Sequence, residues 1–193
     1  MKRLGLAILA MALCVAIARP AMAQRRAGGA MGTLRYGISG GIVMPMGDYN
    51  TIDKLGFVGG VGATYWLAGT GNIGVRGDLS YSQTSHDEAV TTVAGHTKII
   101  GGMASFVYAL NPASAPARIL LNAGLGFYNV KADVTGGGSA SESKVGFGGG
   151  AAVAFKLGTG STRLVVGSRF TSVSTSGSST TFLPITVGLT FGK

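Results

Sequence analysis

Cysteine is almost missing from this sequence, and so are acidic side chains and long apolar runs. The one cysteine, Cys14, lies near the N-terminus, so the rest of the chain has no thiol. A disulfide framework and thiol catalysis are therefore excluded. After the N-terminal segment, no stretch approaches the roughly 20 consecutive apolar residues that a spanning helix requires.

The chain is apolar all the same. Charged residues make up 12% of the 193 residues, about half the usual fraction. Mean hydropathy is +0.39, and 34 residues are glycine. Disorder is excluded, because the sequence is too apolar and too periodic. High apolarity without a spanning helix indicates either strands in lipid or a soluble domain with a very apolar core.

Residues 1–23 have the pattern of a secretory signal peptide. Lys2 and Arg3 precede an apolar stretch over Leu4–Ala18, and Ala21-Met-Ala23 is a small-x-small cleavage site. A membrane anchor is disfavoured, because the stretch is short and no stop-transfer pattern follows. We therefore expect residues 24–33 to be an N-terminal lead-in and residues 34–193 to form a barrel domain.

A lipoprotein is also disfavoured, because Leu13 stands before Cys14 where a small residue would be required. The formal net charge is +9. Removal of the signal peptide leaves 13 of the 16 basic residues against 7 acidic ones, because Lys2, Arg3 and Arg19 are lost. Nucleic-acid binding is not predicted, because no basic helix, zinc spacing or stacking motif accompanies this charge.

The C-terminal stretch Thr180–Phe191 alternates with period two, which is typical of a β-strand. Its apolar face holds Leu183, Ile185, Val187, Leu189 and Phe191. Seven more stretches alternate in the same way: Leu34–Met46, Gly56–Leu67, Ile73–Gln83, Thr97–Leu110, Arg118–Lys131, Lys144–Leu157 and Thr162–Val173. In the fourth, both faces are apolar. We assign Ile100, Ala104, Phe106, Tyr108 and Leu110 to its lipid-facing side.

Two kinds of connection alternate between the eight strands. The longer, polar ones are Gly47–Leu55, Thr84–His96, Ala132–Ser143 and Ser174–Ser179, and we call their side the loop end. The shorter ones are Ala68–Asn72, Asn111–Ala117 and Gly158–Ser161, at the turn end. An even strand number with this asymmetry predicts an all-β, eight-stranded, antiparallel up-and-down transmembrane barrel.

Three features predict that the apolar face meets lipid. The other face is dominated by Gly, Ala and Ser, as the narrow interior of eight strands requires. Of the acids, only Asp78 lies within a strand. The outward aromatics fall into two girdles. At the turn end these are Tyr36, Tyr65, Tyr108, Phe155 and Phe191, and at the loop end Phe57, Tyr81, Phe127, Phe147 and Phe170.

With these features the chain resembles the small outer-membrane β-barrel proteins of Gram-negative-type bacteria, the OmpX and OmpA-barrel-like group. The resemblance rests on the cleavage site, the eight strands and the ending Leu183-Pro-Ile-Thr-Val-Gly-Leu-Thr-Phe191. It implies that Thr186, Gly188 and Phe191 form an assembly signal, although Lys193 stands at the family's final aromatic position. It further implies an outer-membrane location and a monomer. The implied partners are outer-membrane lipid, lipopolysaccharide, periplasmic chaperones and the barrel-assembly machinery.

The expected interior carries charged residues. Arg76 and Asp78 are two apart on one face, so they can pair, with help from Arg169. Four bases lie near the turn end and form a basic periplasmic rim: Arg35, Arg118, Lys156 and Arg163. One interpretation is a hydrated lumen that attracts anions. The favoured one is that these side chains reach water at the rim or lipid phosphates.

The sequence contains no motif that predicts catalysis. His86, Asp87, Glu88 and His96 share one loop, but their spacing matches no metal-ligand pattern. We therefore expect no enzyme, no cofactor and no metal. The favoured function is a structural, surface-interaction or adhesion-type role. The alternatives are a small porin-like barrel with a basic lumen and a soluble lipocalin-like periplasmic barrel that binds a ligand.

Overall fold

The computed structural model describes residues 32–192, except 52, 70, 88–93 and 176–177. The predicted signal peptide, most of the lead-in and Glu88 lie outside the described residues. Within the described part of the chain, no helix is long and apolar enough to cross a membrane.

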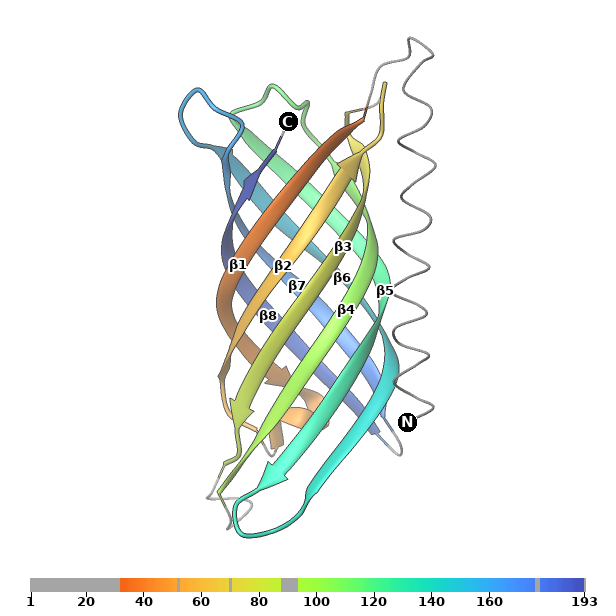
Figure 1. Ribbon diagram of the computed structural model, residues 1–193, viewed down its shortest axis with the longest axis vertical. Helices are drawn as coiled ribbons and strands as arrows, with labels where there is room; N and C mark the ends of the chain where they lie inside the picture. The colour runs from red at the N-terminus through yellow and green to blue at the C-terminus, as the bar shows by residue number, and fades with distance from the viewer. Residues whose placement is uncertain (1–31, 52, 70, 88–93, 176–177, 193) are drawn as a thin grey trace. The chain divides into compact units, whose positions relative to one another are not determined.

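Eight antiparallel strands close into a barrel in which each strand pairs with its sequence neighbour and β8 pairs with β1 (Figure 1). The predicted architecture is therefore confirmed. The strands are β1 (Thr33–Met46), β2 (Gly56–Trp66), β3 (Ile73–Ser85), β4 (Gly95–Ala109), β5 (Ala117–Val134), β6 (Ser139–Lys156), β7 (Arg163–Thr175) and β8 (Ser178–Phe191).

The strand limits correct the predicted loops at one place in particular. β5 and β6 each have 18 residues, so the expected long connection Ala132–Ser143 is mostly strand. Only residues 135–138 separate the two strands, and Gly136 takes a positive φ of 78° in that turn. Asp133 and Ser139 still pair across the hairpin. The asymmetry between the ends therefore comes partly from a hairpin that extends past its neighbours.

The sequence did not predict the short 3-10 helix η1 (Gly47–Thr51), which follows β1 at the loop end. Gly47, the first residue of this helix, has a φ of 60°, a left-handed conformation that glycine adopts without strain. The helix places Tyr49 in a buried position. One of the two longest connections thus folds back onto the barrel.

The exposure of the side chains follows the alternation along the strands. On β4, Ile100, Phe106 and Tyr108 are exposed, whereas Ile99, Met103 and Val107 are buried. The assignment of the outward face of this strand is confirmed, and its ambiguity has a physical reason: the inward residues of β4 fill the lumen. Because the large apolar side chains face outward, the soluble lipocalin-like alternative is wrong.

Two apolar clusters of buried side chains occupy the lumen toward its two ends. The cluster nearer the loop end consists of Val43, Tyr49, Ile99, Tyr128, Val173 and Phe182. The cluster nearer the turn end consists of Trp66, Val107, Ala109, Leu120 and Ala154. Glycine makes room for the Tyr128 ring, because a Cβ on Gly101 would collide with the Tyr128 side chain.

Candidate functional sites in the lumen and at its two ends

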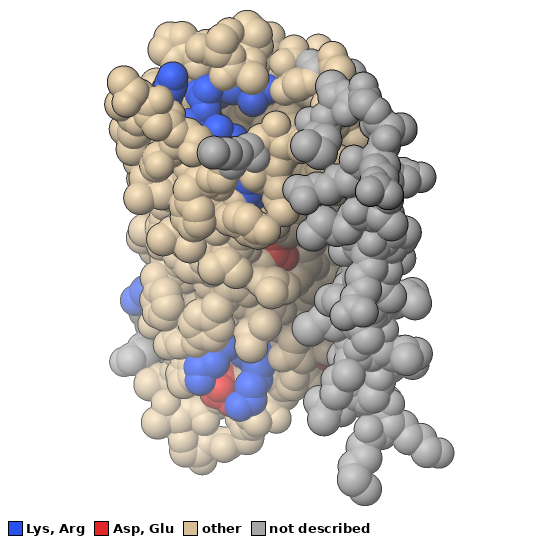
Figure 2. All heavy atoms as spheres, turned by 45° about the horizontal axis from the view of Figure 1, so that its top comes forward, with Lys and Arg blue, Asp and Glu red and all other residues tan. Residues whose placement is uncertain are grey.

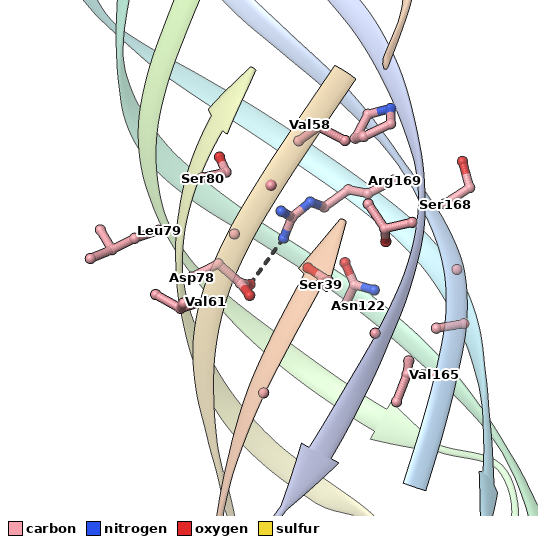
Figure 3. A pocket seen from close by; sticks show the side chains of 18 of the residues that line it. Ser39, Val58, Val61, Asp78, Leu79, Ser80, Asn122, Val165, Ser168 and Arg169 are labelled. Atoms are coloured by element: carbon pink, nitrogen blue, oxygen red, sulfur yellow. Dashed lines mark hydrogen bonds and ion pairs between the residues drawn. The ribbon is translucent and has the colours of Figure 1, made fainter. Parts of the chain in front are cut away.

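The ion pair of the inner wall lies at mid-height in the barrel. Arg76 Nη2 lies 2.7 Å from Asp78 Oδ1, and its Nε lies 2.8 Å from the same oxygen. From the opposite wall, Arg169 Nη1 reaches Asp78 Oδ2 at 3.1 Å (Figure 3). Asp78 is buried. The structure therefore brings together the three residues that the sequence grouped.

A cavity of about 110 Å³ adjoins this ion pair. Its lining includes Ser39, Asp78, Ser80, Asn122 and Arg169 (Figure 3). Arg76 and Thr186 line it as well. Two polar atoms beside it, Arg169 Nε and Asn122 Oδ1, are buried and have no protein partner among the described residues. A space of this size and polarity holds several water molecules. The mid-lumen is thus suited to hydration, while the apolar clusters lie on either side of it.

Three arginines tie the turns together at the turn end. Arg118 donates from Nη2 to Gly71 O at 2.7 Å and from Nε to Asn111 O at 3.3 Å. Arg163 donates to Ala113 O at 2.7 Å and to Ala115 O at 3.2 Å, and Arg35 donates to Ser161 O at 2.9 Å. Every connection at this end thus accepts a guanidinium hydrogen bond.

We expected these basic side chains to reach water at the rim or lipid phosphates, and two of them do not reach water; contact with lipid phosphates stays a prediction. Arg118 is 5% exposed and Arg163 is 6% exposed. Arg118 stacks on the Trp66 ring, with its Cζ 4.4 Å from the ring centroid. Lys156, which lies directly opposite Arg163 in the β6–β7 register, is exposed as expected. Figure 2 shows basic side chains near both ends of one face, with mostly uncharged surface between them.

A buried polar network closes the loop end. Thr84 donates to Asp53 Oδ1 at 2.7 Å, and Thr97 donates to Asp53 Oδ2 at 3.0 Å. The Tyr49 hydroxyl lies 2.7 Å from Thr84 Oγ1, and His86 Nε2 lies 3.3 Å from Thr97 Oγ1. Burial raises the pKa of Tyr49 well above its usual range. The network fastens η1 and the first connection to β3 and β4.

Sequence reasoning missed this network because its members lie on separate strands and connections that are distant in sequence. The available signal was limited to Asp53 and to two threonines, Thr84 and Thr97, near the ends of their predicted strands. The candidate metal group is not assembled either. His86 belongs to the network, Asp87 pairs with Lys54 at 3.0 Å, and His96 lies 3.5 Å from Asp133. Among the described residues, no group of three metal-binding side chains occurs.

Asp133 lies on the outer face of the β5–β6 hairpin and is surrounded by basic side chains. Lys131 Nζ lies 2.9 Å from this carboxylate, and Lys98 Nζ lies 3.4 Å from it. The two lysines are directly opposite each other in the β4–β5 register. Like charges at such positions repel, so Asp133 supplies the negative charge that this pair requires.

The aromatics of the two predicted girdles are all exposed. Some of them lie close to one another on neighbouring strands. Tyr36 is directly opposite Phe191 at the turn end. At the loop end, the Phe57 and Tyr81 rings lie 6.0 Å apart. The membrane levels of these rings stay a prediction, as does the assembly signal. A glycine is required at position 188 by packing alone, because a Cβ on Gly188 would collide with the Ile38 carbonyl.

Known structures share this fold. Neisserial surface protein A has 16% sequence identity and a TM-score of 0.59, over 86% of this chain and 99% of that one. A major outer membrane protein from Thermus thermophilus has 12% identity and a TM-score of 0.60, over 83% and 99%. The Yersinia pestis attachment invasion locus protein Ail, solved with the heparin analogue sucrose octasulfate, has 18% identity and a TM-score of 0.51, over 84% and 99%.

These identities show a shared fold. A search of curated proteins finds no match to this sequence. The family model of the outer membrane protein beta-barrel domain, however, matches residues 7–191. Together with the closed eight-stranded barrel and its apolar outer face, this match shows that the chain belongs to the outer membrane β-barrel domain family.

Proposed function

We propose that this protein is a non-catalytic, non-conducting barrel that anchors a projecting hairpin at the outer-membrane surface. The observation that carries the proposal is the filling of the lumen. Tyr128 and Phe182 lie edge to face nearer the loop end, with ring centroids 6.2 Å apart. Nearer the turn end, Trp66 and Arg118 stack across the lumen. A continuous water path would have to pass both layers.

Conductance in planar lipid bilayers tests this part of the proposal. The wild-type barrel should give no steady current steps in 1 M KCl. A matched variant with Tyr128→Ala and Phe182→Ala removes the aromatic layer nearer the loop end but leaves the one at Trp66. This variant should also give no steady current steps. Regular single-channel steps from the wild type would contradict the non-conducting role and favour the porin-like alternative.

The β5–β6 hairpin supports the surface-interaction role. Its outer face carries polar contacts instead of apolar side chains: Asn129 Nδ2 donates to Ser141 Oγ at 3.0 Å and to Ser143 Oγ at 2.9 Å. Lys98 and Lys131 lie on the same side of the sheet beside Asp133. A hydrogen-bonded, polar extension of this kind suits contact with a partner or with lipopolysaccharide headgroups.

A shortened hairpin tests the role of the extension. Residues 130–133 face residues 139–142 in the β5–β6 register, so deletion of both sets removes matched pairs and keeps the alternation. Cells that display this variant should adhere to surfaces and to one another less than cells with equal amounts of wild-type barrel. Unchanged adhesion would contradict a role of the hairpin in surface interaction.

The proposed location includes export by a cleaved signal peptide. We expect the protein isolated from outer membranes to begin at Gln24. We also propose that it is a monomer and that periplasmic chaperones and the barrel-assembly machinery insert it. N-terminal sequencing and heat-modifiable gel mobility of the membrane fraction test these points, and a retained N-terminal segment would contradict cleavage.

A further inference from the structure

The basic group at the turn end has an excess of positive charge that the described residues do not balance. Arg35, Arg118, Lys156 and Arg163 all lie there, and none of the ion pairs between described residues includes any of them. Arg118 and Arg163 are buried. Charges removed from water are ordinarily retained where an opposite charge is near.

The opposite end of the barrel provides a comparison within the same molecule. Lys98 and Lys131 are directly opposite in register, and Asp133 bridges them. Lys156 and Arg163 are likewise directly opposite in register, but their hydrogen bonds and ion pairs include no carboxylate from the described residues. The same like-charge arrangement therefore has a negative partner from the chain at one end only.

A second, independent observation comes from Trp66. Trp66 is only 7% exposed, and its indole Nε1–H has no hydrogen-bond partner among the described residues. Arg118 lies over the face of the same ring. An indole nitrogen can only donate, so Trp66 Nε1 lacks an acceptor beside a guanidinium group that no carboxylate of the described residues balances. Buried donors of this kind are ordinarily paired.

We propose that the turn end of the lumen is a binding site for an oxyanion of the phosphate class. Arg35, Arg118 and Arg163 would supply its positive charge, and Trp66 Nε1 would supply a neutral donor. Planar guanidinium groups match the oxygens of phosphate, and a divalent anion suits several neighbouring cations better than a carboxylate does. The ligand can be free phosphate or the phosphate of a lipid headgroup.

Trp66 makes the test direct, because it is the only tryptophan in the chain. The folded full-length barrel is placed in a phosphate-free, non-ionic detergent, and its tryptophan emission is followed at constant ionic strength. One arm adds sodium phosphate against sodium chloride. The second arm adds short-chain phosphatidic acid against short-chain diacylglycerol, which has no phosphate.

A saturable change with sodium phosphate supports the site and identifies a soluble ligand. A saturable change with phosphatidic acid alone supports the site and identifies a lipid headgroup. Changes that chloride or diacylglycerol reproduce would overturn the proposal, as would no change in either arm.

Two variants locate the effect. Arg35→Gln loses one charge and the hydrogen bond to Ser161 O, so it should fold and bind roughly tenfold more weakly. Lys98→Gln removes a charge at the loop end and should bind like the wild type. Heat-modifiable gel mobility establishes that each barrel is folded. Equal affinity in wild type and Arg35→Gln would place the anion elsewhere and overturn the assignment.

Discussion

Asp78 on β3 accepts a hydrogen bond from Arg169 on β7 at 3.1 Å, which joins two walls of the barrel that are 91 residues apart in sequence. The same carboxylate is held by Arg76 on its own strand. A single acid thus neutralises part of the charge of two arginines in the middle of the lumen.

Asp78→Asn should destabilise the barrel by about 3 kcal/mol, because it leaves two partly buried guanidinium groups without their carboxylate. Urea unfolding followed by Trp66 fluorescence measures the change. Arg169→Met is the matched variant and should cost less, because Arg76 and Asp78 remain paired. Equal losses in the two variants would show that the pairing of Asp78 with Arg76 contributes little to stability.

The period-two alternation made most of this fold predictable from the sequence. It located all eight strands and the inward placement of Arg76, Asp78 and Arg169, because side-chain direction in a strand depends only on residue parity. The same parity assigned the outer face of β4, even though Ile99 and Val107 are apolar and face inward.

Residue parity does not predict which side chains contact each other across the lumen. It also does not predict where a strand ends. The buried state of Arg118 and Arg163 depends on carbonyls of connections that are distant in sequence, such as Gly71 and Ala113. The sequence did not predict the length of the β5–β6 hairpin, because the Gly, Ser, Asp and Glu residues of Ala132–Ser143 are typical of a loop. A polar strand with both faces in water can have a similar composition.

Thr84→Val should destabilise the loop end by about 1–3 kcal/mol, because it removes the hydroxyl that lies between Tyr49 and Asp53 and leaves buried polar groups unpaired. A double-mutant cycle with Tyr49→Phe tests the connection through equilibrium unfolding. The two changes should be less than additive, since each breaks the same Tyr49–Thr84 contact. Additive losses would mean that the two hydroxyls act independently.

Tyr49 should make the stability depend on alkaline pH. Its pKa is raised by burial, so the unfolded chain releases this proton first as the pH rises through about 10. The corresponding stability is fully present below that pH and should fall by roughly 1 kcal/mol by pH 11. Tyr49→Phe cannot ionise and should show a flatter profile between pH 9 and pH 11. Parallel profiles for the two proteins would contradict a buried, neutral Tyr49.

Phe191→Ala should slow insertion of the barrel more than it lowers the stability of barrels that have already inserted. The side chain is exposed at the outer surface, directly opposite Tyr36, so it contributes little packing inside the lumen. Its expected role is recognition of the last strand during assembly. Pulse-labelled appearance of the heat-modifiable band in cells measures insertion, and urea unfolding of purified barrels measures stability.

Phe155→Ala provides the matched control, because Phe155 is an equally exposed phenylalanine at the end of β6, outside the last strand. Both substitutions remove the same area from lipid, so their effects on stability should agree within about 0.5 kcal/mol. Only Phe191→Ala should delay insertion. If Phe155→Ala delays insertion to the same extent, the loss of an interfacial aromatic explains both effects, and the residue has no special part in assembly.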